Sequence, residues 1–203
     1  MFIRLDSGHL DQRPPPMPNV QERIIRQYAE WTVLSALRSG SRIKSRDDVY
    51  GALRTVDFEP LFDKALGSIS AGEFNAWHER SVARLRRHEQ RLTVGWAAKM
   101  LNVYLKTSCY IGALGRHHLS EAIHPPIDSG LWRGLRRAFP DRPDILGETH
   151  CVKSIKDIQD YPCYLRIVAG CRLAARALDC KLIEIEQLWE GTATPVRKRG
   201  NRA

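Results

Sequence analysis

Lys99 and Asp128 are the two residues of this chain best suited to carry out chemistry together. A lysine amine held beside a carboxylate can attack an electrophilic sugar carbon, provided that burial keeps the amine neutral. The chain between the two residues is long enough for a helix to run out and for a loop to return. We therefore expect Lys99 to be a nucleophile and Asp128 to lie beside it.

A plainer interpretation accounts for the same two residues. Lys99, Asn102 and Lys106 recur at helical spacing, so they can form the polar stripe of a core helix. Asp128 precedes a helical segment and is a typical N-cap residue. The residues alone leave both interpretations open.

Helical periodicity accounts for most of the chain between residues 21 and 191, and no run of alternating residues predicts a strand. We therefore expect an all-α, compact helical domain over residues 21–191, after an irregular leader (1–20) and before a basic, disordered tail (192–203). The predicted helices cover residues 21–37, 46–54, 60–66, 70–90, 94–114, 119–122, 128–138, 162–178 and 182–189.

The apolar spacing predicts which faces of these helices are buried. The segment 94–114 is apolar nearly all round, so neighbouring helices must enclose it. Ser70 and Glu73 form a capping-box pattern at the start of the helix 70–90. The first helix is predicted to bury Ile24, Ile25, Tyr28, Trp31, Leu34 and Leu37.

Composition narrows the classes of function. The 203 residues carry a net charge of +9, from 32 Lys and Arg against 23 Asp and Glu, and such an excess favours a polyanionic partner such as DNA. No apolar run is long enough to span a membrane and no secretory signal opens the chain, so a cytoplasmic location is expected. The five cysteines lack CxxC spacing, which predicts neither a zinc site nor a cofactor.

The segments 94–100 (VGWAAKM) and 126–132 (PIDSGLW) resemble the catalytic segment of helix-hairpin-helix DNA glycosylases, above all the 8-oxoguanine glycosylase/lyase branch. The resemblance covers residues 92–132. It implies that Lys99 attacks the sugar C1′ and forms a Schiff base, and that Asp128 assists departure of the damaged base. It also implies a fold of the helix-hairpin-helix glycosylase type.

Base excision requires a pocket for a flipped nucleotide and a surface that holds DNA. The glycine-rich hairpin of the family is reduced here to Val94-Gly95, so basic side chains are expected to replace its phosphate contacts. The expected base-pocket residues are Trp96, Tyr104, His124 and Trp132. The expected DNA-binding residues are Arg84, Arg87, Arg91, Arg116, His117 and Arg133.

Two other classes of function stay open. His117, His118, His124 and Asp128 could serve a metal-dependent hydrolase, although Pro125 and Pro126 break the spacing that would align His124 with Asp128. The other alternative is a non-catalytic helical module that binds nucleic acid or a protein, associated with defence against phage. It requires only the arginine-bearing helix faces.

Overall fold

The computed structural model of the chain describes residues 19–37 and 40–189. The predicted tail at 192–203, and the predicted leader apart from residues 19 and 20, lie outside the described residues. Within the described ranges every regular element is helical, which confirms the predicted all-α class. The elements are α1 (Val20–Leu37), α2 (Arg46–Arg54), α3 (Glu59–Phe62), η1 (Lys64–Leu66), α4 (Ala71–His88), α5 (Val94–Leu105), η2 (Lys106–Ile111), α6 (Leu119–Ala122), α7 (Ser129–Ala138), α8 (Pro143–Thr149), η3 (Ile155–Asp157), α9 (Tyr161–Ala177) and η4 (Leu182–Leu188).

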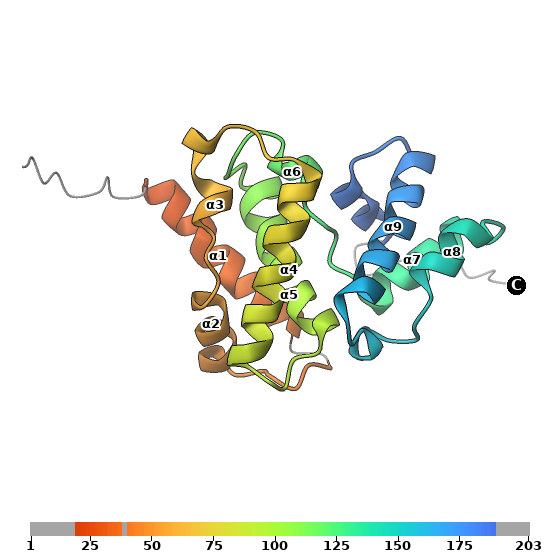
Figure 1. The fold of residues 1–203 in the computed structure, drawn as a ribbon, viewed down its shortest axis with the longest axis horizontal. Helices are drawn as coiled ribbons and strands as arrows, with labels where there is room; N and C mark the ends of the chain where they lie inside the picture. The colour runs from red at the N-terminus through yellow and green to blue at the C-terminus, as the bar shows by residue number, and fades with distance from the viewer. Residues whose placement is uncertain (1–18, 38–39, 190–203) are drawn as a thin grey trace, which may run out of the picture.

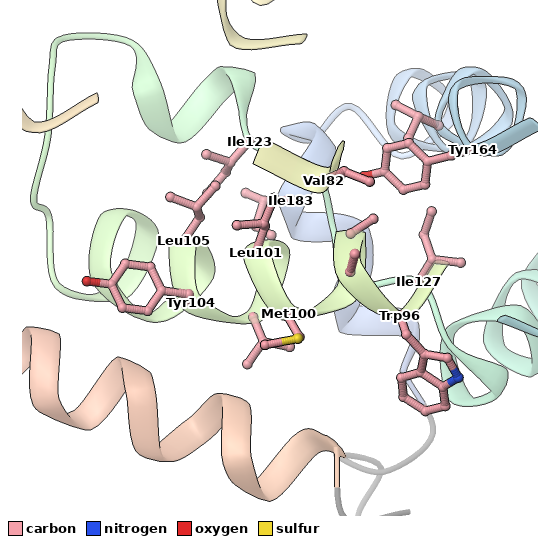
Figure 2. Packing of buried hydrophobic residues seen from close by; sticks show 14 of the residues in the cluster. Val82, Trp96, Met100, Leu101, Tyr104, Leu105, Ile123, Ile127, Tyr164 and Ile183 are labelled. Atoms are coloured by element: carbon pink, nitrogen blue, oxygen red, sulfur yellow. The ribbon is translucent and has the colours of Figure 1, made fainter. Parts of the chain in front are cut away.

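The helices form two groups, α1 to α6 on one side and α7 to α9 on the other, and the segment that follows α6 crosses between them (Figure 1). Helix α5 lies in the centre and packs against α1 and α4 within the first group and against α9 in the second. All twelve of its residues are buried. Figure 2 shows its side chains, from Trp96 to Leu105, among Ile123, Ile127 and Ile183. The predicted enclosure of the segment 94–114 is confirmed for residues 94–105, whereas Tyr110 and Ile111 near its end are exposed.

Capping fixes where the two long central helices begin. Ser70 and Glu73 form the predicted capping box at the start of α4, with the Ser70 side chain accepting from the Glu73 amide and the Glu73 carboxylate accepting from the Ser70 amide. Thr93 caps α5 in a similar way. Helix α4 then buries Phe74, Trp77, Val82 and Leu85, as its spacing predicts.

The central helix changes geometry at Lys106, where α5 gives way to the π-helix η2. The Thr107 and Ser108 hydroxyls donate to the carbonyls of Val103 and Tyr104, four residues earlier, and so take up carbonyls that an α-helix would use for its backbone amides. The sequence predicts one helix over 94–114 because apolar spacing contains no information about this competition between hydroxyls and backbone amides for the same carbonyls. The wider turn begins at Lys106, which lines a cavity together with Lys99.

The predicted buried face of α1 is correct at Leu34 and Leu37 but wrong at Ile24, Tyr28 and Trp31. These three side chains are 58%, 55% and 50% exposed, and the helix buries Ala29 and Val33 instead. The rings of Tyr28 and Trp31 stack on one another with their centroids 5.5 Å apart. Helix α1 thus has two apolar faces, and residues 19–37 and 40–189 cover only one of them.

Three further elements differ from the predictions. The segment 60–66 divides into α3 and the 3₁₀ turn η1, the last segment η4 is 3₁₀ rather than α-helical, and α8 was not predicted. Short helices are fixed mainly by tertiary packing, here of α8 on α9, and not by a periodic apolar face. None of the helices in the described ranges is both long and apolar enough to cross a membrane.

A buried polar network joins α4, α5, α9 and the segment after α6. The Asn102 amide group donates to the Pro125 carbonyl and to the Tyr164 hydroxyl, while its oxygen lies 3.0 Å from His78 Nε2. His124 Nδ1 lies 2.9 Å from the same Tyr164 hydroxyl. The side chains of His78, Asn102 and His124 are fully buried. One polar residue of α5 therefore holds three other elements.

The surroundings of both histidines disfavour the charged ring. The Tyr164 hydroxyl accepts from Asn102 and lies beside His124 Nδ1, while His124 Nε2 has no hydrogen-bond partner among the described residues. Desolvation lowers the pKa of His78 to about 4 and lowers the pKa of His124 well below its usual value. Both rings are neutral in the folded protein at neutral pH.

This network predicts that acidification destabilises the protein. A histidine whose folded pKa lies below its unfolded value contributes fully above pH 6.5 and loses that contribution as the pH falls towards about 4. We expect His78 alone to account for about 3 kcal/mol of the change. Urea unfolding at several pH values measures it, and the pH dependence should be smaller in His78→Gln than in the wild type.

The exposed His117 supplies the matched control, since His117→Gln should keep the full pH dependence of the wild type. An unfolding free energy that falls equally in wild type, His78→Gln and His117→Gln would contradict the assignment of the effect to the buried network.

Candidate functional site

Lys99 and Asp128 form an ion pair in the structure, with Lys99 Nζ 3.0 Å from Asp128 Oδ2. Their side chains are 9% and 19% exposed. Lys99 also places its ammonium 5.4 Å from the centre of the Trp96 ring, within the range of a cation–π contact. The two residues therefore meet, from different helices, at a largely desolvated place.

Asp128 is held by donors on three sides. It is the N-cap of α7, and its Oδ1 accepts from the backbone amides of Gly130 and Leu131 at 2.9 and 3.1 Å. The same oxygen accepts from the indole N–H of Trp189 at 2.9 Å. Asp128 thus makes two kinds of contact at once: Oδ1 caps the helix and fixes the carboxylate, while Oδ2 faces Lys99.

Two glycines of α7 make room for Trp189. A Cβ on Gly130 would lie 2.1 Å from the Trp189 Nε1, and a Cβ on Gly134 would lie 1.8 Å from the Leu188 carbonyl oxygen. Because these residues lie four apart, their bare faces align along one side of α7, and the end of η4 packs there. The indole can reach Asp128 only because this strip of the helix has no side chains.

The ion pair lies in the wall of a cavity of about 960 Å³ between α1, α5, α7, η3 and η4. This volume is at the upper end of those found for small-molecule and cofactor sites. Aromatic and apolar side chains supply much of its lining, which includes Tyr28, Trp96, Val103, Trp132 and Trp189. A flat, partly polar group the size of a nucleoside fits both the volume and the lining.

Charged side chains surround the remainder of this cavity. A second ion pair, Lys106 with Glu186, lines it with a separation of 2.8 Å between Nζ and Oε2. The exposed residues Arg133, Lys153 and Lys156 also line it, two of them from the segment around η3. An excess of positive charge around a cavity attracts anionic ligands, phosphodiesters among them.

The four expected base-pocket residues separate into two pairs. Trp96 and Trp132 line the cavity with Lys99 and Asp128. Tyr104 lies at the other end of α5 from Trp96 (Figure 2) and stacks on Phe58, 4.4 Å away, and it is not among the lining residues. His124 belongs to the buried network instead.

Of the six expected DNA-binding residues, Arg133 alone lines the cavity, and His117 is exposed elsewhere. Arg84 and Arg87 line a separate hollow of about 520 Å³ on α4. Arg91 pairs with Asp48 and Glu89.

The guanidinium of Arg116 donates to four backbone carbonyls, those of Pro60, Leu66, Gly67 and Ser68. Its contacts tie a loop together.

The short Val94-Gly95 segment serves packing. The Gly95 amide donates to the Ile158 carbonyl, and a Cβ on Gly95 would lie 2.1 Å from the Ile155 carbonyl oxygen. The amide is thus already used within the protein, and the missing side chain lets η3 approach α5. The same contact places Lys153 and Lys156, on either side of Ile155, at the cavity.

The residues considered for a metal site do not come together. His117 and His118 are exposed and His124 is buried, and no group of three or more His, Cys, Asp or Glu side chains in the described ranges could hold a metal ion. The cavity offers ion pairs and aromatic rings instead.

Sequence reasoning missed Trp189, Glu186, Lys153 and Lys156. Glu186 and Trp189 come from a short 3₁₀ segment whose position depends on tertiary packing. One signal was present: Gly130 and Gly134, four residues apart in a predicted helix, indicate a face that another segment approaches closely.

A scan of protein-family models, a search of curated proteins and a search of solved structures each found no match to this chain.

The packing of Trp189 on α7 predicts the effect of a methyl group at Gly130. Gly130→Ala should displace the indole from Asp128 and lower the free energy of unfolding by about 1–3 kcal/mol, as overpacking does. Urea unfolding measures this change. The matched control is Gly147→Ala in α8, where nothing lies within 4 Å of the new Cβ.

Because alanine has a higher helix propensity than glycine, the Gly147→Ala control should be neutral or stabilising by up to about 1 kcal/mol. Equal stability of Gly130→Ala and the wild type would show that the Trp189 contact does not hold the site together.

Proposed function

We propose that this protein is a DNA glycosylase with associated lyase activity, of the helix-hairpin-helix glycosylase type, that acts on 8-oxoguanine-type bases in the cytoplasm. The single observation that carries the proposal is the Lys99–Asp128 pair, largely desolvated and 3.0 Å apart in the wall of a cavity large enough to admit a nucleoside. The resemblance of the segments 94–100 and 126–132 supports it, because the two residues it singles out are the ones that meet.

The first step of this reaction needs a neutral amine. Asp128 Oδ2 is in contact with Lys99 Nζ and is the nearest acceptor for the lysine proton. The neutral amine then attacks C1′ while the bond from C1′ to the base breaks and the electron pair leaves with the base. Asp128 returns the proton to the departing base. The carboxylate thus ends the step in the form in which it began.

The second step makes the Schiff base. The new secondary ammonium passes a proton to Asp128, the nitrogen lone pair expels O4′ from C1′, and O4′ takes up that proton as the ring opens. An imine activates the neighbouring C2′ for proton loss, so the 3′ phosphate leaves from C3′ with its bonding electrons. Water then hydrolyses the imine and restores Lys99.

The surroundings suit these steps. The cavity's aromatic lining offers faces on which an extruded base can stack, with Trp96 and Trp189 closest to the ion pair through their contacts with Lys99 and Asp128. Arg133, Lys153 and Lys156 lie where a phosphodiester entering the cavity would pass. Base excision uses each of these features.

The proposal predicts covalent trapping. Borohydride reduction in the presence of DNA containing 8-oxoguanine or an abasic site should join the wild-type protein to the DNA, and Lys99→Met should abolish the adduct on both. Asp128→Asn keeps the helix cap and loses the proton acceptor, so it should slow base release by about a hundredfold or more. Gel electrophoresis of the reduced mixtures measures both.

Lys64→Met is the control for loss of a lysine, because Lys64 is exposed on η1 and does not line the cavity. It should trap as the wild type does. An adduct that persists in Lys99→Met, or a wild type that forms none, would refute the proposed function.

A non-catalytic binding module remains the second candidate, and two observations favour it. One is the hollow between Arg80, Arg84, Arg86 and Arg87 on α4, and the other is the apolar face of α1 that the described part of the chain leaves exposed. Such a module would bind DNA with a strong dependence on salt and would form no adduct. The trapping experiment therefore separates the two candidates.

A further inference from the structure

The Lys106–Glu186 pair has no part in the reaction steps above, although it lines the same cavity. Lys106 follows Lys99 by seven residues, nearly two helical turns, so both lysines extend from the same side of the central helix about 10 Å apart along its axis. The Glu186 carboxylate is close enough to the first pair that Asp128 and Lys99 both influence its pKa. The two ion pairs are thus neighbours.

A contribution to the stability of the fold does not by itself explain why the Lys106–Glu186 ion pair is present. Burial raises the pKa of the Glu186 carboxyl, and the proximity of Lys106 offsets only part of that effect. Replacing such a pair with apolar side chains is often neutral or stabilising, because the free-energy cost of removing two charges from water can exceed the attraction between them. A pair that is poor at stabilising the fold, and that faces a cavity, is suited to bind what enters it.

The donors and acceptors of the pair define what it can bind. After their mutual hydrogen bond, the Lys106 ammonium still has N–H donors, and the Glu186 carboxylate still has acceptor positions on its two oxygens. The complementary ligand edge has one acceptor for the lysine and two adjacent donors for the carboxylate. It must also be flat, because aromatic side chains line the cavity.

Among the four normal nucleobases, guanine alone has that edge. In guanine O6 is an acceptor, and N1–H and the 2-amino group are two donors beside it; 8-oxoguanine keeps all three groups. Adenine and cytosine pair a single exocyclic amino group with a bare ring nitrogen, and thymine places one N–H between two acceptors. The carboxylate can therefore accept two hydrogen bonds from adjacent donors of guanine but not of the other three normal bases.

We propose that Lys106 and Glu186 recognise the O6, N1–H and 2-amino edge of a guanine-type base whose sugar C1′ lies beside Lys99. This inference rests on the proposed function and specifies its substrate. Lys106 and Glu186 are specificity-determining residues that touch the base, whereas Lys99 and Asp128 act on the sugar. The base lies between the two pairs along one side of the central helix.

The test compares three duplexes that differ at one nucleotide: 8-oxoguanine, 8-oxohypoxanthine, which lacks the 2-amino group, and an abasic site. The wild type should release 8-oxoguanine faster than 8-oxohypoxanthine. Glu186→Gln should slow release of 8-oxoguanine by about tenfold to a hundredfold, the effect of losing a charge-assisted hydrogen bond, and should lose the preference between the two bases.

Glu184→Gln is the matched control, since Glu184 lies on the same helix η4, does not line the cavity, and can keep its hydrogen bond to the Lys181 amide as glutamine. It should release both bases as the wild type does. The abasic duplex has no base to recognise, so borohydride trapping by Glu186→Gln should persist there and depend on Lys99.

Each other outcome overturns the inference. If Glu186→Gln traps on abasic DNA but releases 8-oxoguanine at the wild-type rate, the pair does not recognise the base. The same conclusion follows if the wild type releases both bases at the same rate, or releases neither. If Glu186→Gln also loses abasic trapping, Glu186 supports the site as a whole and not the base edge. If the wild type traps no DNA at all, the proposed function fails and this assignment fails with it.

Discussion

The carboxylate of Asp128 is the point at which three parts of the structure meet. It accepts hydrogen bonds from the first turn of α7, from the indole of Trp189 after η4, and from the amine of Lys99 on α5. A carboxylate removed from water is stable only when such donors surround it. The geometry of the cavity therefore depends on this residue, because the elements that form its walls are also those that neutralise its charge.

Helix α5 separates two polar environments of opposite character. On one side Lys99 and Lys106 are charged and paired within a cavity. On another side Asn102 joins a network of histidine and tyrosine side chains, in which burial keeps both histidines neutral. Charge is thus confined to the side that a ligand can reach, and the side facing the core uses neutral hydrogen bonds, which cost less to bury.

The sequence was sufficient for the parts of the fold governed by local signals. The capping box at Ser70, the helix starting after Asp128 and the enclosed central helix all follow from spacing and side-chain chemistry over a few residues. The pairing of Lys99 with Asp128 follows from their chemistry and the length of chain between them, and the family resemblance points to the same two residues; the structure places the two in contact.

Other features depended on contacts between distant segments and could not be predicted. Glu186 and Trp189 reach the cavity because α7 presents two glycines to η4, and Lys153 and Lys156 reach it because Gly95 admits η3. The Tyr104 and Arg116 assignments illustrate the opposite error. An aromatic ring and a guanidinium suit nucleic acid chemically, but one packs on Phe58 and the other holds a loop by its carbonyls. Residue type indicates what a side chain can do, whereas packing decides what it does.

The residues of α1 whose burial is wrongly predicted lie at the border of the cavity. The spacing of Ile24, Tyr28 and Trp31 is that of a buried helix face, yet these side chains are about half exposed, and Tyr28 also lines the cavity. Local pattern and tertiary structure usually agree in a folded protein, and disagreements concentrate where function imposes a second requirement. An apolar face that leads into a cavity containing two ion pairs continues the surface on which a ligand would lie. The face of α1 whose burial is wrongly predicted therefore borders the cavity that contains the two ion pairs.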